Sequence, residues 1–170
     1  MSLENVFQHS SELRAEICKD LSEKQTQRAM IWMNLQDTLN RGDFAAMDAF
    51  FHDDFSYGNP SRPDLGSYAS WKTSPMELYK RFPPSAYRTK AVAGANDDEV
   101  WVYCHHTGKH TGGPYMGKPP EGKEISVEWF SSVSFKGDKI VRIFSIADVL
   151  SMLIQIDVVD PAVLPVDPYK

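Results

Sequence analysis

Three closely spaced histidines are the leading candidates for catalytic residues in this chain. His105 and His106 lie in a strand-like stretch, and His110 follows shortly after it. Histidine is the side chain best suited to acid or base catalysis near neutral pH. Because neighbouring strand residues point to opposite faces, His105 and His106 cannot both face one cavity. We expect one histidine, His106 or His110, to be the catalytic one, and the others to lie at the surface or at a subunit interface.

The spacing of these histidines does not favour a metal site. Two histidines four residues apart form a metal-binding pair on a helix, not on a strand. On a strand, His106 and His110 would lie about 13 Å apart, too far to share one ion. The chain also lacks a phosphate-binding loop, a Gly-x-Gly-x-x-Gly motif, a Gly-x-Ser-x-Gly turn and a Cys-x-x-Cys pair. We therefore predict no metal and no cofactor.

Asp148 is the third candidate for acid or base catalysis. Burial at the floor of a cavity would raise the pKa of its carboxyl group into a range useful for proton transfer. The alternative is structural, because Ser145 and Asp148 have the spacing of a capping box. Capping of the last helix is the simpler of the two interpretations.

Aromatic residues make up 12% of the chain and suit a cavity for a small hydrophobic ligand, including flat or cyclic ones. Alternation along residues 124–135 places Trp129 and Ser131 on the more apolar face, and alternation along 139–146 does the same for Val141, Ile143 and Ser145. Ordinary core packing is the alternative for every aromatic residue. The predicted ligand-binding residues are Tyr57, Trp71, Tyr79, Tyr103, Trp129, Ser131 and Ser145.

The elements that must position these residues follow from local patterns. Residues 11–21 have helical spacing, and Ser22 with Gln25 forms a capping box for a long helix that Gly42 ends. Asp43 is expected to cap a short helix over 44–51, and Ser74-Pro75-Met76-Glu77 is typical of the start of another. Strands are expected at 55–57, 87–93, 99–107, 124–135 and 139–146. This order predicts an α+β fold, a curved antiparallel sheet wrapped round about three N-terminal helices.

A single domain over residues 22–157 accounts for these elements. A partly helical extension over 1–21 precedes it, with a loose first segment over 1–10, and a Pro-containing tail over 158–170 follows it.

The composition excludes several classes of partner. Of 170 residues, 42% are hydrophobic and 24% are charged, as in a globular protein. A net charge of −5 without a basic cluster argues against nucleic acid. No apolar run is long enough for a membrane span, and the N-terminus lacks the pattern of a secretory signal. Two isolated cysteines, Cys18 and Cys104, favour the cytoplasm.

A turn-rich segment, TGKHTGGPYMGKPPEGK, spans residues 107–123 and is followed by GDKI at 137–140, FSIAD at 144–148 and LSMLIQI at 150–156. These motifs resemble the SnoaL-like polyketide cyclase family, which has the nuclear transport factor 2-like fold. In that family a Gly-Thr-His-Thr-Gly hairpin precedes a Gly-x-Pro-Pro and a Thr-Gly-Lys segment. The resemblance is close over the last third of the chain. The matching residues of the hairpin region are Gly108, His110, Thr111, Gly112, Gly117, Pro119, Pro120, Gly122 and Lys123.

The resemblance implies a cone-shaped domain, a homodimer and a ligand cavity. It places Trp129, Ser131 and Ser145 where the cyclases carry a Gln, a His and an Asp as working polar residues. The acid/base aspartate of the cyclases thus falls on Ser145, while Asp148 matches the second aspartate of their Trp-Asp-x-x-Asp segment. Exposed phenylalanines on the outer sheet face, Phe130 and Phe144, also favour a homodimer.

The leading hypothesis is an enzyme of polyketide cyclase type that performs cofactor-independent acid/base chemistry on a small hydrophobic molecule. The reaction would be an aldol-type cyclisation, an isomerisation or a dehydration, with His106, His110 or Asp148 as the base. A second hypothesis is a non-catalytic ligand-binding domain, favoured by the serine at position 145. A third is a protein-interaction module with a collapsed cavity.

Overall fold

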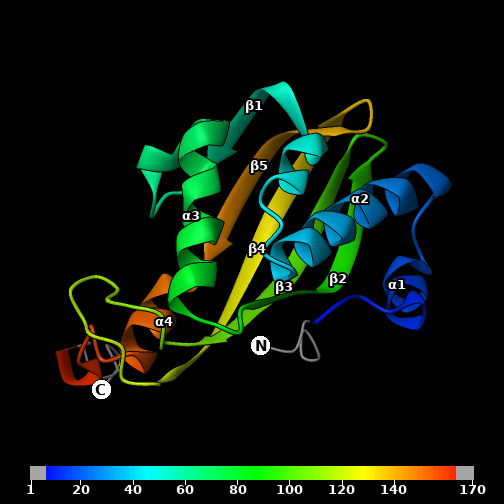
Figure 1. Cartoon of the computed structure of the whole chain (residues 1–170). Helices are drawn as coiled ribbons and strands as arrows, with labels where there is room; N and C mark the ends of the chain where they lie inside the picture. The colour runs from blue at the N-terminus through cyan, green and yellow to red at the C-terminus, as the bar shows by residue number, and fades with distance from the viewer. Residues whose placement is uncertain (1–6, 164–170) are drawn as a thin grey trace, which may run out of the picture.

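The computed structural model describes residues 7–163, in which helices cover one face of a five-stranded sheet (Figure 1). Residues 1–6 and 164–170, and with them most of the predicted tail, lie outside the described residues. The α-helices are α1 (Ser11–Cys18), α2 (Glu23–Asn40), α3 (Tyr68–Arg81) and α4 (Val149–Gln155). Short 3-10 helices are η1 (Ala46–Phe50), η2 (Pro63–Leu65) and η3 (Pro161–Val163). The strands are β1 (Phe51–Gly58), β2 (Ala86–Asn96), β3 (Glu99–Lys109), β4 (Glu124–Lys136) and β5 (Lys139–Ala147).

The sheet has the strand order β1-β5-β4-β3-β2. Strands β2 to β5 form an antiparallel meander, but β1 pairs parallel to β5, so the sheet is mixed rather than wholly antiparallel. Helices α2 and α3 cover the same, concave face (Figure 1). The α+β fold predicted from the sequence is therefore confirmed, with one parallel pair added.

The long helix α2 begins and ends where its capping residues predict. The Ser22 hydroxyl accepts a hydrogen bond from the backbone N–H of Gln25, whose side chain accepts one from the N–H of Ser22. Gly42 follows the last turn with a φ of 70°, the left-handed conformation that a glycine adopts without strain. Asp43 caps the next segment through the N–H of Ala46, but that segment is the 3-10 helix η1 and not an α-helix.

The predicted start of a helix at Ser74 is wrong. Helix α3 begins at Tyr68, because Ser67, seven residues before Ser74, forms a capping box with Ser70. Pro75 consequently lies inside the helix, where it has no N–H for the carbonyl of Trp71. The longer helix carries Trp71 and Pro75 on its buried face.

The two faces of the sheet differ as the alternation predicts, with one exception on β5. On β4, Val127, Ser131 and Val133 are buried, whereas Phe130 is 61% exposed. On β5, Ile143 and Ser145 are buried as expected, but Ile140 takes the inner position predicted for Val141. An irregularity in the pairing of β4 with β5 causes this change, since Ser134 pairs with Arg142 while Phe135 pairs with Ile140.

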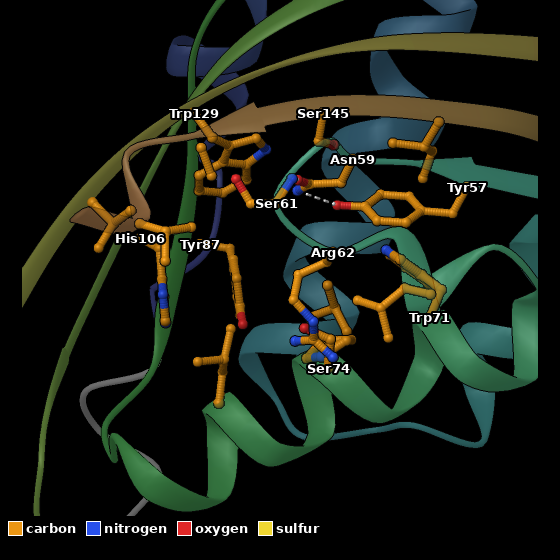
Figure 2. A pocket seen from close by; sticks show the side chains of 18 of the residues that line it. Tyr57, Asn59, Ser61, Arg62, Trp71, Ser74, Tyr87, His106, Trp129 and Ser145 are labelled. Carbon is orange, nitrogen blue, oxygen red and sulfur yellow. Dashed lines mark hydrogen bonds between the residues drawn. The ribbon is translucent and has the colours of Figure 1, made fainter. Parts of the chain in front are cut away.

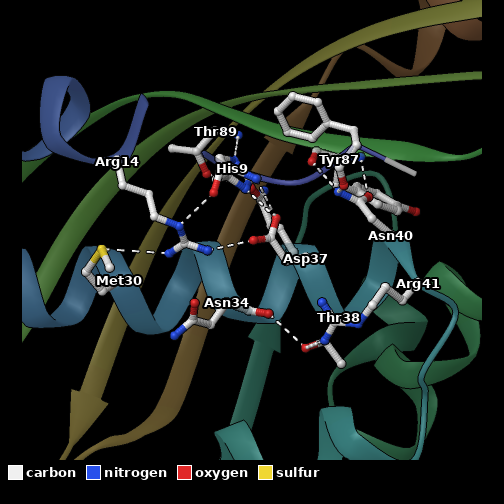
Figure 3. Close-up of polar contacts among 12 residues, drawn as sticks. His9, Arg14, Met30, Asn34, Asp37, Thr38, Asn40, Arg41, Tyr87 and Thr89 are labelled. Carbon is white, nitrogen blue, oxygen red and sulfur yellow. Dashed lines mark hydrogen bonds and ion pairs between the residues drawn. The ribbon is translucent and has the colours of Figure 1, made fainter. Parts of the chain in front are cut away.

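Within the lead-in over 1–10 that was predicted to be loose, a buried polar network fixes His9, whereas residues 1–6 lie outside the described residues (Figure 3). The backbone N–H of Thr89 donates to His9 Nε2 at 2.9 Å, so the ring proton lies on Nδ1, which donates to Asp37 Oδ1 at 2.6 Å. Arg14 binds the other carboxylate oxygen at 2.6 Å. Burial acts to raise the pKa of Asp37, but the His9 and Arg14 contacts outweigh it and hold that pKa below its ordinary value.

A second contact of this region ties α2 to β2. The side-chain amide of Asn40 accepts a hydrogen bond from the N–H of Tyr87 at 2.7 Å and donates one to the carbonyl of Tyr87 at 2.9 Å. Both backbone groups of Tyr87 are thus satisfied by one buried side chain.

Two glycines of the turn-rich segment let the end of α3 approach β3. Gly112 donates to the carbonyl of Arg81 at 3.0 Å, and a Cβ atom on Gly112 would lie 1.8 Å from the carbonyl oxygen of Lys80. A Cβ atom on Gly108 would lie 2.4 Å from the carbonyl oxygen of Phe82. These glycines therefore permit backbone contacts that any larger residue would break.

Within residues 7–163, none of the helices combines the length and the apolar composition that crossing a bilayer requires.

Gly112→Ala should lower the free energy of unfolding by about 1–3 kcal/mol, because the added methyl group collides with backbone that cannot rotate away. Gly66→Ala is the matched control, since Gly66 has a φ of −59° and open space around it. Urea denaturation of the three proteins measures both effects, and equal stability of the two variants would contradict this account of the close approach.

Candidate functional site

A cavity of about 390 Å³ lies between the concave face of the sheet, helices α2 and α3, and the loop over residues 59–65. Its volume is within the range of small-molecule sites. Most of its wall is apolar, with Leu35, Leu39, Leu65, Val127, Ile143 and Met152 among the lining residues.

Half of the predicted site residues meet at this cavity (Figure 2). Tyr57 and Trp71 approach from β1 and α3, with the amide of Asn59 donating to the Tyr57 hydroxyl at 3.1 Å. Trp129 and Ser145 approach from the sheet. The predicted lining residues at these positions thus converge, together with the candidate base, His106.

Three of the predicted ligand-binding residues lie elsewhere. Ser131 is buried behind Ser145, and the two hydroxyl groups are 2.6 Å apart. Tyr79 packs edge-on against Phe44 at the other side of α3. Tyr103 stacks on Phe130 at 4.6 Å on the outer face of the sheet.

Two of the predicted catalytic residues also lie away from the cavity wall. His110 is buried, and its Nε2 lies 2.8 Å from the carbonyl oxygen of Gly113 within the turn that follows β3. Asp148 is exposed and caps α4 by accepting from the N–H of Ser151 at 3.0 Å. The capping role of Asp148 is therefore present, although Ser145 takes no part in it.

His106 is the predicted catalytic residue that lines the cavity. Its ring stacks on that of Tyr87, with centroids 4.3 Å apart and planes 4° from parallel, and its Nε2 lies 2.7 Å from the Ser85 hydroxyl. Burial, and to a smaller extent the neighbouring His105, lower the pKa of His106 to about 3. The imidazole is therefore neutral at physiological pH. His105 points to the outer face, where its Nε2 lies 2.8 Å from the Ser126 hydroxyl.

Tyr87 is a site residue that the sequence analysis missed. It lies directly opposite His106 in the pairing of β2 with β3, so a register set from the turn between these strands could have revealed it. Its hydroxyl group is buried and has no hydrogen-bond partner within the described part of the chain. Burial raises the pKa of this hydroxyl. The Ser85 hydroxyl, which is bonded to His106, lies near enough to offset part of that shift but does not meet the geometry of a hydrogen bond to Tyr87. A buried hydroxyl without a partner is costly, which favours a ligand group or a water molecule at this point.

The charges around the cavity are few. Arg62, which the sequence analysis also missed, is the one charged residue among the described lining residues. Within residues 7–163, no three His, Cys, Asp or Glu side chains gather in a way that could hold a metal ion.

Because His106 is neutral in the folded protein, we expect the protein to lose stability in acid. An unfolded chain binds this proton near pH 6.5, the folded protein only near pH 3, so between these values the unfolded state holds more protons. The free energy of unfolding should fall as the pH falls through that window, by up to about 1.4 kcal/mol per pH unit from this group. Subtracting the profile of His106→Gln from that of the wild type isolates the effect, with His105→Gln as control. Parallel profiles for wild type and His106→Gln would contradict a buried neutral imidazole.

Several solved structures have the same fold as this chain. AclR from Streptomyces galilaeus, a candidate hydroxylase, aligns with a TM-score of 0.71 and 19% identity over 80% of this chain and 88% of that one. A candidate SnoaL-like polyketide cyclase from Jannaschia sp. aligns with a TM-score of 0.70 and 19% identity over 83% and 99%. IdmH from Streptomyces antibioticus, a candidate polyketide cyclase, aligns with a TM-score of 0.66 and 20% identity over 77% and 99%. At these identities the similarity establishes the fold alone.

No curated protein matches the chain at a significant level. The sequence profile of a known family does match it, from residue 29 to residue 156, and so covers most of helix α2, the whole sheet and helix α4. The family resemblance of the turn-rich segment and the fold agree with that match. The chain belongs to the SnoaL-like polyketide cyclase family.

Proposed function

We propose that the protein binds a small hydrophobic molecule in this cavity and catalyses a proton transfer on it without a cofactor. An aldol-type cyclisation, an isomerisation or a dehydration each begins with such a step. The observation that carries the proposal is the pairing of a neutral, buried imidazole with an unpartnered tyrosine hydroxyl on the wall of a ligand-sized cavity. Family membership supports the reaction class.

His106 is the proposed base, and Tyr87 the proposed donor to the developing oxyanion. His106 would take a proton from the carbon beside a ligand carbonyl, while the Tyr87 hydroxyl would donate to the enolate oxygen that forms. A low pKa makes the imidazole a weak base in the empty cavity. A negative charge beside it favours the imidazolium form, so formation of the enolate and protonation of His106 would support each other. Ser85, at 2.7 Å from Nε2, would accept a hydrogen bond from the N–H at that atom, which would fix the ring orientation and leave the lone pair of Nδ1 to take the proton.

Because Ser145 occupies the position of the family's acid/base aspartate, the base is proposed at another position. Ser145 and Ser131 share a hydrogen bond and neither has a pKa suited to taking a proton at neutral pH. His110 and Asp148 have structural contacts away from the cavity wall, so the proposal gives them no part in the proton transfer.

His106→Gln should slow proton exchange by a factor of about 100 or more, in line with the usual contribution of general base catalysis. The probe is a panel of aromatic β-diketones in deuterated water, with incorporation of deuterium followed by nuclear magnetic resonance. His105→Gln is the matched control, because His105 is the adjacent residue on the opposite face. Tyr87→Phe should also slow the exchange while the ligand still raises the melting temperature.

Equal rates in wild type and His106→Gln would contradict the assigned base. Loss of activity in His105→Gln as large as in His106→Gln would show a general structural effect instead.

A non-catalytic binding domain is the second candidate function. It is favoured by one observation, that no aspartate or glutamate is among the described residues lining the cavity. It predicts that diketones raise the melting temperature of the wild type but exchange no faster than in buffer.

We also propose that a second copy of this chain covers the outer face of the sheet. Tyr103, Phe130 and Ile146 form a row across β3, β4 and β5, and Phe130 and Ile146 are each 61% exposed. Phe144, the other phenylalanine expected there, is half-buried against Gly58. The ion pair of Lys90 with Glu128 borders the row and offers charges of both signs to a copy related by a twofold axis.

Phe130→Asp should convert a dimer into a monomer, because it places an unpaired charge in the centre of an apolar interface. Light scattering coupled to size-exclusion chromatography measures the mass. Ala69→Asp, at an exposed position on α3 on the other side of the sheet, should leave the dimer intact. A monomeric wild type at micromolar concentration would refute the dimer.

A further inference from the structure

We propose that the ligand carries a carboxylate on its hydrophobic skeleton and that Arg62 binds this group at the mouth of the cavity. The inference rests on the proposed function, because it concerns the same cavity. It adds the chemical class of the ligand and a residue that selects it.

The cavity wall carries a single kind of charge. The described lining residues include one cation, Arg62, and no aspartate, glutamate or lysine. The rest of the wall is apolar or carries neutral polar groups. Among the lining side chains, a ligand with a negative group would therefore meet one opposite charge and no like charge; the nearby carboxylate of Asp64 is not among them and pairs with Arg62.

The hydrogen bonds of Arg62 leave part of its guanidinium group available. Its Nε and Nη2 atoms donate to the two carboxylate oxygens of Asp64 at 2.9 and 2.7 Å. Its Nη1 atom makes no hydrogen bond with the described residues, so two N–H groups remain for a ligand. Asp64 is well exposed to solvent, which screens its charge. Asp64 consequently orients the guanidinium group and reduces, without removing, its attraction for a second anion.

The loop that carries Arg62 is built to hold it at the mouth. Asn59 accepts at its carbonyl from the N–H of Arg62 at 3.0 Å, and its side chain accepts from the N–H of Ser61 at 2.8 Å. The N–H of Leu65 donates to the carbonyl of Arg62 at 3.2 Å. Figure 2 shows the Arg62 side chain among the side chains that line the pocket.

Tyr115 shares the cavity wall with Arg62 and senses its charge. Burial raises the pKa of the Tyr115 hydroxyl, and the positive charges of Arg62 and Arg81 offset part of that rise. Both Tyr115 and Arg62 line the cavity. Burial keeps this phenol protonated, but the same positive charges would attract a carboxylate placed beside them.

A pair of fluorescent dyes that differ in a single group tests the inference. Anilinonaphthalene sulfonate and phenylnaphthylamine share their aromatic skeleton, and the sulfonate of the first stands in for the carboxylate. The dissociation constants of both dyes are measured by fluorescence titration for wild type, Arg62→Gln, Arg62→Lys and Arg142→Gln. Arg142, exposed on the outer face of β5, is the matched control. Displacement of the neutral dye by the anionic dye establishes that both occupy one cavity.

We expect Arg62→Gln to weaken binding of the anionic dye about tenfold or more and to leave the neutral dye within about twofold, as loss of a charge-assisted hydrogen bond implies. Arg62→Lys should restore part of the difference, and Arg142→Gln should change neither constant. Equal loss for both dyes, no loss for the anionic dye, or failure of the two dyes to compete would overturn the role of Arg62. Binding of neither dye to the wild type would instead overturn the proposed ligand cavity itself.

Discussion

The close backbone approach between the end of α3 and the turn after β3 is the constraint on which the site depends. Hydrogen bonds from Thr111 and Gly112 to the carbonyl of Arg81 fix the helix against the sheet. Helix α3 then becomes one wall of the cavity, with Trp71 and Pro75 facing inward. The chain leaves this contact directly into the start of β2, which carries Tyr87. The glycines of the turn-rich segment therefore serve packing, and their presence alone says little about chemistry.

Burial determines the protonation state of the titratable groups in the cavity. An imidazole surrounded by apolar side chains is held neutral, and a phenol in the same place is held protonated. Both groups can then donate or accept hydrogen bonds without a fixed charge of their own. The positive charge of Arg62 is kept at the mouth, where solvent lowers its cost.

Much of the fold could be predicted from the sequence because local signals agree with it. The capping box at Ser22 depends only on residues three positions apart, and the alternation on β4 depends only on the period of an extended strand. Predictions failed where a second signal competed. Pro75 looked like the first residue of a helix, but the capping box at Ser67 determines the start of α3. The site was harder, because Tyr87 and Arg62 join it through strand register and loop position, which no local pattern specifies. His9 was unpredictable for the same reason, since its partners Asp37 and Thr89 are distant in the sequence.

The contacts of His9 and Asn40 with β2 bear on how the protein behaves in solution. Strand β2 is at the edge of the sheet, and an open edge is a template for pairing with strands of other molecules. Side chains occupy hydrogen-bonding groups of this edge in place of a neighbouring strand, at the N–H and carbonyl of Tyr87 and at the N–H of Thr89. His9 and Asn40 thus make this edge less available for pairing with other molecules along β2, a consequence that concerns solubility and is separate from the chemistry of the cavity.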